Sequence, residues 1–385
     1  MIKPLEGIRV LDCSQFLSAP SAGLKLADLG AEFIKIEKKG GGDICRQLYV
    51  SNFKIDNDSS LFHAINRNKQ GLELDLKTKK AQHVFKELVK TADVVLINFR
   101  PGVARKLNLD AETIHKINPK IVYGEITGYG ENSPWSSWPG QDLLVQGMSG
   151  ICYLNGDREQ APLPFGLSMA DLAAGEHLCQ GILAGLFNAQ RTGEGCVIQT
   201  ELLTSLMDLQ FESFTTFLNN GNQLPVRSGF HNANPYIDAP YGIYATKNGY
   251  LAIAMCPIVK LAELLDYPEL AAFMETHSVE QDSDEIKRKL QAKLLTQPTE
   301  NWLAILEPAD IWCTKVLDWQ QMEQNGLFEE LKMKQEISSS EGTHFYTTRC
   351  PIRIDGEVFT SEKGAPTLGE DNFKFGIKHS GDKSR

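Results

Sequence analysis

The sequence contains no stretch that approaches the ~18 consecutive apolar residues of a membrane-spanning helix. Its opening residues, MIKPLEGIRVLD, also lack the apolar core of a secretory signal peptide. The eight cysteines are scattered, with no C-x-x-C pair and no histidine at metal-ligand spacing. These absences predict a cytoplasmic protein with reduced thiols and no metal site.

Two nucleotide-binding signatures are also missing. No G-x-G-x-x-G follows the first predicted strand, and no G-K-[ST] of a P-loop occurs in the chain. A nicotinamide-dependent enzyme and a P-loop ATPase are therefore disfavoured. The formal net charge of -10 argues against nucleic acid as a partner, because a phosphate backbone selects basic surfaces.

The chain does contain an alternation of short apolar runs with amphipathic segments. The predicted strands are 7–11, 32–36, 72–76, 94–97, 121–126 and 197–201, and the predicted helices are 20–29, 77–91, 111–117 and 202–218. This alternation predicts an α/β fold with a Rossmann-like, doubly wound parallel sheet. Ligands of such sheets bind at the carboxyl ends of the strands.

A second, smaller domain is predicted further along the chain. Asn248-Gly249 supplies the turn of a predicted hairpin over 241–255, and predicted helices follow at 259–265, at 283–295 and from Thr299. The predicted organisation is a large Rossmann-like α/β domain over 1–205, a helix and linker over 206–240, a small α+β domain over 241–306, a return linker and helix over 307–345, and a C-terminal segment over 346–385 that packs back on the large domain.

Basic residues gather near the ends of the predicted strands. Lys38 and Lys39 precede Gly40 to Gly42, a run that either lets the backbone approach a phosphate or forms a flexible loop. Further cations follow at Arg67, Lys69, Arg100, Arg105 and Lys106. They either bind the phosphates of an anionic ligand or form an ordinary solvated rim.

The stretch Pro162–Thr192 holds the main candidate for chemistry, Asp171. Ser168 and Asp171 have the spacing of a capping box at the start of an apolar helix, a structural role worth roughly 1 kcal/mol. Alternatively, the helix dipole keeps the carboxylate ionised as a nucleophile, while free backbone N–H groups beside it bind an oxyanion. Spacing alone favours the cap.

Longer motifs occur in order over the first half of the chain. They are PLEGIRVLD, KLADLGAEFIKIEKKGGGD, NRNKQGLELDLKT, ADVVLINFRPG, EITGYGENSPW and PGQDLLVQGMSG, with weaker matches at PIRIDGE and APTLGED. Together they resemble the family III CoA-transferases, which include formyl-CoA transferase, carnitine CoA-transferase and the 2-methylacyl-CoA racemases. The ordered set places ADLAAG, and therefore Asp171, on the aspartate that members of this family use as nucleophile.

The resemblance implies an acyl-CoA and a free carboxylic acid as substrates, with no tightly bound cofactor. CoA would pass between the two acids through an aspartyl anhydride and an aspartyl-CoA thioester on Asp171. The energy of the thioester is kept, so no ATP is needed, which agrees with the absent P-loop. The resemblance also implies a Rossmann-like large domain, a small inserted domain and an interlocked homodimer.

Ten positions match CoA-binding residues of the family. The resemblance places Phe16, Leu17 and Ser18 at the reactive end of CoA, Leu72 and Leu74 at the adenine, Asn98, Phe99 and Arg100 beside the pantetheine and diphosphate, and Lys38 and Lys106 at the nucleotide and a phosphate. Lys38 and Lys106 stand where formyl-CoA transferase looks to have arginine, which keeps the charge but loses bidentate geometry. Leu17 replaces a glutamine, which argues against oxalate and formate as substrates.

A racemase of the same family and a non-catalytic CoA-binding protein are the alternatives. A racemase needs a second acid–base residue, a histidine at the position where this chain has Gln141. Because an amide cannot carry a proton at neutral pH, Gln141 disfavours the racemase. Asp142 is interpreted as structural. No role is assigned to the histidines His63, His177 and His231.

Overall fold

The computed structural model describes residues 3–48 and 52–377, so the end of the predicted C-terminal segment, 378–385, lies outside the described residues. The chain forms two compact units. The first comprises Met1–Val145, Ser168–Leu209 and Phe328–Arg385, and the second comprises Gln146–Leu167 and Gln210–Leu327. Over the described ranges, no helix is both long and apolar enough to span a membrane.

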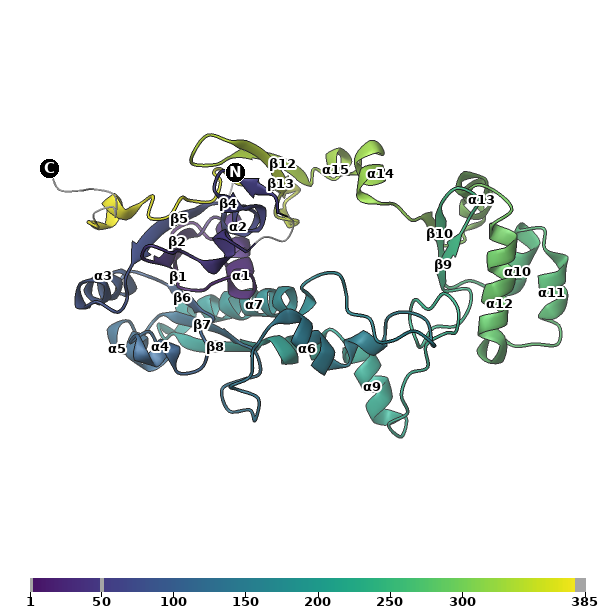
Figure 1. Ribbon diagram of the computed structural model, residues 1–385, viewed down its shortest axis with the longest axis horizontal. Coiled ribbons are helices and arrows are strands. Elements are labelled where there is room, and N and C mark those ends of the chain that lie inside the picture. Colours follow the sequence, from purple (N-terminus) through teal and green to yellow (C-terminus); the bar gives the residue numbers. More distant parts are fainter. Residues whose placement is uncertain (1–2, 49–51, 378–385) are drawn as a thin grey trace. The chain divides into compact units, whose positions relative to one another are not determined.

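The first unit is built around a six-stranded sheet (Figure 1). Its strands are β1 (Arg9–Asp12), β2 (Glu32–Lys38), β5 (Lys69–Leu74), β6 (Val94–Ile97), β7 (Val122–Thr127) and β8 (Cys196–Glu201). They lie in the order β5-β2-β1-β6-β7-β8, and every neighbouring pair is parallel. Successive strands step outward from β1 on one side and from β6 on the other, which is the doubly wound arrangement.

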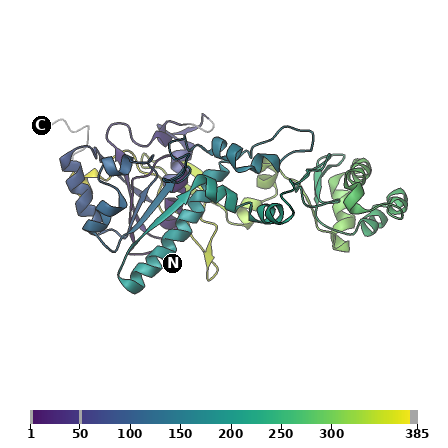
Figure 2. The ribbon, with the colours of Figure 1, turned by 90° about the horizontal axis from the view of Figure 1, so that it is seen from below.

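Helices cover both faces of this sheet (Figures 1 and 2). On one face, α1 (Ser18–Asp28) packs against the 24-residue α7 (Met169–Thr192). On the other face, α3 (Lys79–Val89) and α5 (Ala111–Ile117) share one core cluster with the strands. Because both faces of the central strands are covered, β6 is a continuous apolar run, Val-Val-Leu-Ile, in which all four residues are buried.

The structure confirms the α/β pattern and corrects some boundaries. The strand 94–97 and the helix 111–117 lie where the sequence predicts them, whereas β5 starts at Lys69 and ends at Leu74 instead of covering 72–76. The single predicted helix 202–218 is wrong. It is divided into α8 (Leu202–Asp208) and α9 (Phe211–Asn219) because Gln210 has the non-helical angles φ -102° and ψ 16°.

The segment near the C-terminus lies along the outer edge of β5. The N–H of Gly71 donates to Asp371 at 2.8 Å, and the N–H of Glu73 donates to the Asn372 side chain at 2.9 Å. In return, the N–H of Asp371 donates to the carbonyl of Gly71 at 2.9 Å. These contacts satisfy backbone groups that an edge strand otherwise leaves open.

Shorter elements complete the first unit. They are β3 (Lys54–Ile55), β4 (Asp58–Ser59), α2 (Ser60–Asn66), α4 (Val103–Lys106), β12 (Lys334–Ser338), β13 (His344–Thr348), β14 (Arg353–Ile354) and β15 (Glu357–Val358). In addition, α6 (Asp142–Ser149) begins in the first unit and ends in the second, and α15 (Leu327–Glu330) crosses the last boundary, between Leu327 and Phe328.

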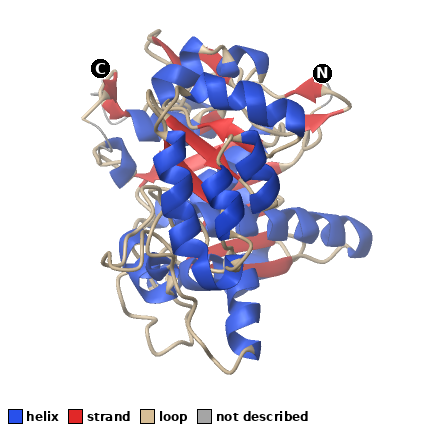
Figure 3. Ribbon diagram, turned by 90° about the vertical axis from the view of Figure 1, so that its right-hand side faces the viewer, coloured by secondary structure: helices blue, strands red, loops and turns tan. Residues whose placement is uncertain are grey.

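The second unit holds a three-stranded antiparallel sheet with helices over one face (Figure 3). Its elements are β9 (Gly242–Ala245), β10 (Tyr250–Ile253), β11 (Cys313–Lys315), α10 (Ile258–Leu264), α11 (Pro268–Phe273), α12 (Val279–Leu294), α13 (Thr299–Leu306) and α14 (Trp319–Gln324), together with α9. The predicted hairpin is confirmed, since β9 and β10 pair across the Asn-Gly turn. The pairing of β11 with β10 was not predicted, because β11 is only three residues long.

Candidate active site

Two loops meet where the strand order reverses, between β1 and β6. The backbone N–H of Gln15, after β1, donates to the Asn98 side chain at 2.8 Å. The Asn98 amide, after β6, donates back to the carbonyl of Gln15 at 2.7 Å. This double hydrogen bond joins the two carboxyl ends at the point of a doubly wound sheet where ligands bind.

A cavity of about 620 Å³ opens beside this junction, within the range of ligand sites, roughly 300 to 1,000 Å³. The segments that follow β1, β2, β5 and β6 form its walls together with α4. Its lining combines four cations with an apolar surface, namely Lys38, Lys39, Lys77 and Arg100 with Ile36, Leu74, Leu76, Phe99, Val103 and Leu107. A ligand with an anionic part and a flat apolar part suits such walls.

The glycine run beside this cavity does not offer its backbone to an anion. The N–H of Gly40 donates to Glu73 at 2.6 Å, and those of Gly41 and Gly42 donate to the carbonyl of Lys38 at 3.4 and 2.9 Å. Gly40 and Gly42 have φ of 78° and 64°, so the run forms an ordered turn that favours glycine. All three amides therefore have partners within the protein, which argues against a phosphate cradle formed by this backbone.

Asp171 lies in the first turn of α7, on the face of the sheet shared with α1. The side chain of Ser168, which precedes the helix, makes no capping hydrogen bond, so the predicted capping box is wrong. A different residue caps the helix. One carboxylate oxygen of Asp142 accepts the N–H of Ala170 at 2.7 Å and the N–H of Asp171 at 3.3 Å. The structural role expected for Asp142 is confirmed.

The loop between β7 and α6 delivers Asp142 to that position. Its two ends touch through glycine backbones, because a Cβ atom on Gly128 would lie 2.8 Å from the Cα of Gly140. The hydroxyl of Tyr129 donates to the carbonyl of Pro139 at 3.2 Å across the same neck. The loop therefore closes tightly, and α6 begins at Asp142 directly beside the start of α7.

The surroundings of Asp171 disfavour its charged form. Burial and, to a smaller extent, the nearby charge of Asp142 raise the pKa of this carboxyl to about 7, against a hydrogen bond from the Ser18 hydroxyl that lowers it. Only 6% of the residue is exposed. The expectation that the helix dipole alone keeps Asp171 ionised is wrong, because loss of water and a second carboxylate outweigh the dipole.

Three amides at the start of α7 are also engaged. Asp142 accepts the N–H groups of Ala170 and Asp171, and the N–H of Leu172 donates to the carbonyl of Ser168 at 3.0 Å. The expected oxyanion site at these amides is therefore occupied by the protein itself. An oxyanion that forms near Asp171 needs donors other than these three amides.

A close helix contact brings Ser18 to Asp171. Gly175, one turn after Asp171, packs on the first turn of α1, where a Cβ atom would lie 2.7 Å from the carbonyl oxygen of Ser18 and would also meet the Ser21 hydroxyl. Only a residue without a side chain allows this approach. The glycine in ADLAAG thus sets the distance between α1 and α7.

Comparison with known proteins agrees with this architecture. The sequence pattern described as CoA-transferase family III matches residues 5–372. The chain belongs to CoA-transferase family III. A protein of Agrobacterium fabrum named succinate–glutarate CoA-transferase is 30% identical over 377 residues, which are 95% of this chain and 93% of that protein.

Further relatives of this family III chain are named for different acids. A protein of Acetobacter aceti named acetyl-CoA:oxalate CoA-transferase is 32% identical over 82% of this chain and 81% of its own length. Other relatives carry names that specify mesaconate or fatty acyl groups. The crystal structure of a CAIB/BAIF family protein from Brucella suis has a TM-score of 0.83 and 27% identity, and the match covers 96% of this chain and 98% of that chain.

The structure brings half of the predicted CoA-binding residues together. The five that line the 620 Å³ cavity are Lys38, Leu74, Asn98, Phe99 and Arg100. Lys106 lies on α4 without lining it, and Leu72 is fully buried in the sheet core. Phe16 and Leu17 lie on the loop into α1, and Ser18 is the first residue of that helix. Leu17 is buried against Cys45 and Phe62, so it does not stand open to a ligand.

Two predicted rim cations of the family III chain are buried. Arg67 pairs with Asp28 at 2.7 Å, and the ammonium of Lys69 lies 3.3 Å from Asp12. Arg67 and Lys69 are only 3% and 0% exposed, so they neither bind a phosphate nor form part of a solvated rim. Residues that line the cavity but were not predicted include Gln15 and Lys77. Both could have been predicted from the sequence, since each follows the end of a parallel strand, where ligands bind.

The three unassigned histidines have separate surroundings. His63 is buried in the first unit, where its Nε2 lies 3.1 Å from the carbonyl of Ile55. The Nε2 of His177 lies 3.2 Å from the carboxylate of Asp208. In the second unit, the ring of His231 packs between Phe230 and Tyr244. These contacts are structural in kind.

Proposed function

We propose that this family III chain transfers CoA from an acyl-CoA to a free carboxylic acid, with Asp171 as the nucleophile. The observation that carries the proposal is the setting of Asp171. A buried carboxyl with a pKa of about 7 lies at the start of α7, against the loop that leaves β1. A desolvated carboxylate is a stronger nucleophile than a hydrated one, and a fraction of it is ionised at neutral pH.

The first half of the reaction releases the donor acid. The Asp171 carboxylate attacks the thioester carbonyl, which forms an aspartyl–acyl anhydride and expels CoA thiolate. The thiolate then attacks the aspartyl carbonyl of the anhydride. This step forms an aspartyl-CoA thioester and frees the donor acid with one oxygen from Asp171.

The second half repeats these steps in reverse with the acceptor acid. Its carboxylate attacks the aspartyl-CoA thioester, expels the thiolate and forms a second anhydride. Attack of the thiolate on the acceptor's acyl carbon gives the new acyl-CoA and restores the Asp171 carboxylate with one acceptor oxygen. No net proton is taken up or released.

The 620 Å³ cavity is the proposed site of the nucleotide end of CoA. Lys38, Lys77 and Arg100 are suited to bind its phosphates, and Leu74 and Phe99 offer apolar surface to the adenine or pantetheine. Phe16 and Ser18 are proposed to meet the reactive end, with Lys106 as an outer phosphate contact. Leu72 is proposed to act without touching CoA, by supporting the cavity wall from inside the core.

Short dicarboxylic acids are the proposed substrates, because the relative from Agrobacterium fabrum that covers 95% of this chain is named for succinate and glutarate. Initial rates of CoA exchange are to be measured with succinyl-CoA and a panel of acids that includes glutarate, mesaconate, oxalate and a medium-chain fatty acid. We expect glutarate to be among the best acceptors. A preference for the fatty acid over every dicarboxylic acid would contradict the substrate proposal without touching the role of Asp171.

The role of Asp171 is tested by Asp171→Ala. The variant is expected to lose acyl exchange while it binds CoA with unchanged affinity in calorimetric titration. Asp208→Ala, which changes an exposed aspartate of the same unit, is the matched control. Undiminished turnover of Asp171→Ala would overturn the mechanism.

A racemase is the second candidate, because a carboxyl with a pKa of about 7 also suits proton transfer. Deuterium entering the α-position of a 2-methylacyl-CoA during incubation in heavy water would support it. We expect no such exchange, since Gln141 cannot act as the second base.

The homodimer is likewise proposed from the family, and light scattering at micromolar concentration tests it.

A further inference from the structure

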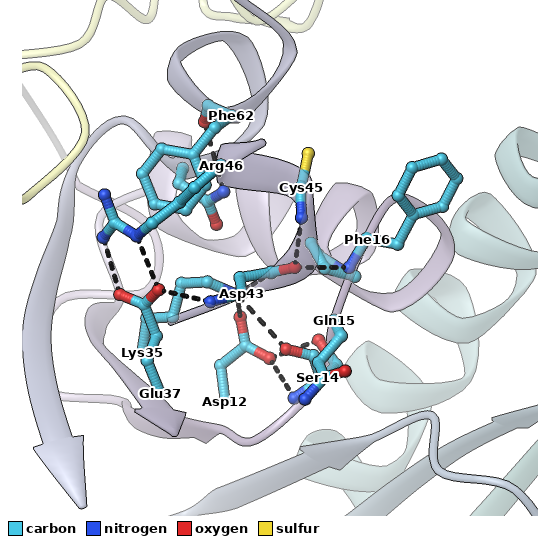
Figure 4. A network of polar contacts seen from close by, with 12 residues as sticks. Asp12, Ser14, Gln15, Phe16, Lys35, Glu37, Asp43, Cys45, Arg46 and Phe62 are labelled. Carbon is cyan, nitrogen blue, oxygen red and sulfur yellow. Dashed lines mark hydrogen bonds and ion pairs between the residues drawn. The ribbon is translucent and has the colours of Figure 1, made fainter. Parts of the chain in front are cut away.

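A buried ion pair lies beneath the loop that leads from β1 into α1 (Figure 4). The Lys35 ammonium lies 2.8 Å from one carboxylate oxygen of Asp43, and the side chains are 0% and 1% exposed. The other oxygen of Asp43 accepts the backbone N–H of Phe16 at 3.0 Å and that of Cys45 at 2.9 Å. Figure 4 shows Asp43 at the centre of these contacts, with the ring of Phe16 turned away from them.

The hydrogen bond to Phe16 supports an unfavourable backbone conformation. Phe16 has a φ of 65°, in the left-handed region that residues with a Cβ atom rarely adopt. Asp43 holds its N–H from one side, while Asn98 holds the N–H and carbonyl of Gln15 from the other. The turn at Phe16 is therefore fixed by side chains from two distant segments of the chain.

The same ion pair also fixes a nearby residue, Ser14. The Lys35 ammonium donates to the carbonyl of Ser14 at 3.2 Å, and Asp12 accepts the N–H of Ser14 at 2.9 Å. Burial lowers the pKa of Lys35, but the carboxylates of Asp12 and Asp43 raise it more, so the ammonium stays charged. Both backbone polar groups of Ser14 are thus tied to buried charges.

This turn ends at Ser18, whose hydroxyl contacts the carboxyl of Asp171. The Asn98 amide lies 3.4 Å from the same hydroxyl. A buried ion pair contributes little net stability compared with apolar side chains of the same volume. The pair of Lys35 and Asp43 therefore has its main value in the conformation that it imposes.

We propose that Asp43 is a positioning residue, which together with Lys35 fixes the turn at Phe16 and so places the Ser18 hydroxyl against Asp171. The assignment rests on the proposed role of Asp171 as nucleophile. The plain alternative is that Asp43 only caps the short 3-10 helix Ile44–Arg46, through its contact with Cys45. A positioning role predicts a loss in kcat, whereas a cap predicts a loss in stability alone.

The first test compares Asp43→Ala with Asp28→Ala. Asp28 belongs to another buried pair of the first unit, 2.7 Å from Arg67, away from the turn at Phe16. Both variants are to be assayed at a temperature at which each is fully folded by circular dichroism. We expect Asp43→Ala to lower kcat by about 10- to 100-fold with a smaller change in KM, since misplacement by about 1 Å has effects of this size. Asp28→Ala is expected to stay within about threefold of wild type. Equal kcat values for the two variants would overturn the proposal.

A second comparison uses two double variants. Both lack the charges of Lys35 and Asp43, and they differ only in whether residue 43 can accept hydrogen bonds. In Lys35→Met with Asp43→Asn, the asparagine oxygen still accepts the N–H of Phe16 and of Cys45. In Lys35→Met with Asp43→Ala, nothing replaces it. The asparagine double variant is expected to keep a kcat about tenfold above that of the alanine double variant. The same kcat in both would show that the turn does not depend on Asp43.

Hydrogen exchange separates this proposal from the proposed function. The amide of Phe16 is to be followed by mass spectrometry in the peptide around residues 13–19, without substrate. Faster exchange in Asp43→Ala than in wild type and Asp28→Ala supports the positioning role, even if exchange of CoA turned out not to need Asp171. Unchanged exchange at Phe16 would contradict it.

Discussion

One carboxylate oxygen of Asp142 accepts the backbone N–H of Asp171 at 3.3 Å, and the charge of the same side chain raises the pKa of the Asp171 carboxyl. Asp142 therefore acts on its neighbour in two opposite ways. It stabilises the start of α7 as a cap, and it destabilises the ionised form of the proposed nucleophile. Both effects can be separated by substitutions.

Activity is expected to rise with pH through an acid limb near pH 7. Only the ionised Asp171 can attack, and its pKa is raised to about 7, so the active fraction is lost as the pH falls below that value. Asp142→Asn keeps an oxygen that can cap the helix but removes the charge. The limb of kcat/KM should then move to lower pH.

The control for this shift is Asp208→Asn, which removes an exposed negative charge paired with His177. We expect its limb to coincide with that of wild type. A limb that stays near pH 7 in Asp142→Asn would show that Asp142 does not tune Asp171.

Asp171→Asn is expected to stabilise the folded protein at alkaline pH. The folded pKa of Asp171, about 7, lies above the ordinary value of 3.8, so ionisation opposes folding once the pH rises above the ordinary value. The gain should be on the order of 1 to 4 kcal/mol at pH 8 to 9 and vanish below about pH 4. Urea unfolding at the two pH values measures it, and an equal effect at both would show that ionisation of Asp171 is not its cause.

Gly175→Ala is expected to reduce activity through the helix contact. The added Cβ would lie 2.7 Å from the carbonyl oxygen of Ser18, so α1 must move away from α7. We expect a loss of about 1 to 3 kcal/mol in stability and of about 10- to 100-fold in kcat.

Gly147→Ala provides the matched helical substitution, because a Cβ there meets nothing within 4 Å. It is expected to be neutral or stabilising by about 0.5 to 1 kcal/mol. Equal kcat values for the two glycine variants would argue that the approach of Ser18 to Asp171 has no part in turnover.

The positions of the inner strands could be predicted from the sequence because both of their faces are buried. Short apolar runs such as 94–97 therefore stand out against amphipathic helices. The capping of α7 was not readable. Ser168 and Asp171 have the spacing of a local cap, but the contact is made by Asp142, 29 residues away, through a loop closed by two glycines.

The sequence also does not show which basic residues are buried and which line the cavity. Arg67 and Lys69 look the same in sequence as Lys38 and Arg100, yet the first two are buried in ion pairs and the last two line the cavity. The difference depends on carboxylates that come from other strands and helices. Asp28 and Asp12 supply those partners, and no local pattern connects them with positions 67 and 69.

The cavity cations are expected to act on binding and not on chemistry. Lys77→Ala and Arg100→Ala should each raise the KM for acyl-CoA about tenfold with little change in kcat, because a charged hydrogen bond to phosphate is lost in both ground and transition states. Lys90→Ala removes an exposed cation paired with Glu87 on the same unit and should leave KM unchanged. A fall in kcat with constant KM for Arg100→Ala would place that residue in the chemistry.

The most direct test of the mechanism follows oxygen into Asp171. Each turnover should leave one oxygen of the acceptor acid on this carboxylate, and the aspartyl-CoA thioester should be trapped by hydroxylamine at the same residue. The enzyme is to be incubated with succinyl-CoA and oxygen-18-labelled glutarate, quenched and digested. We predict label and hydroxamate in the peptide that contains Asp171. Turnover of labelled acid without either mark on Asp171 would contradict its role as the nucleophile.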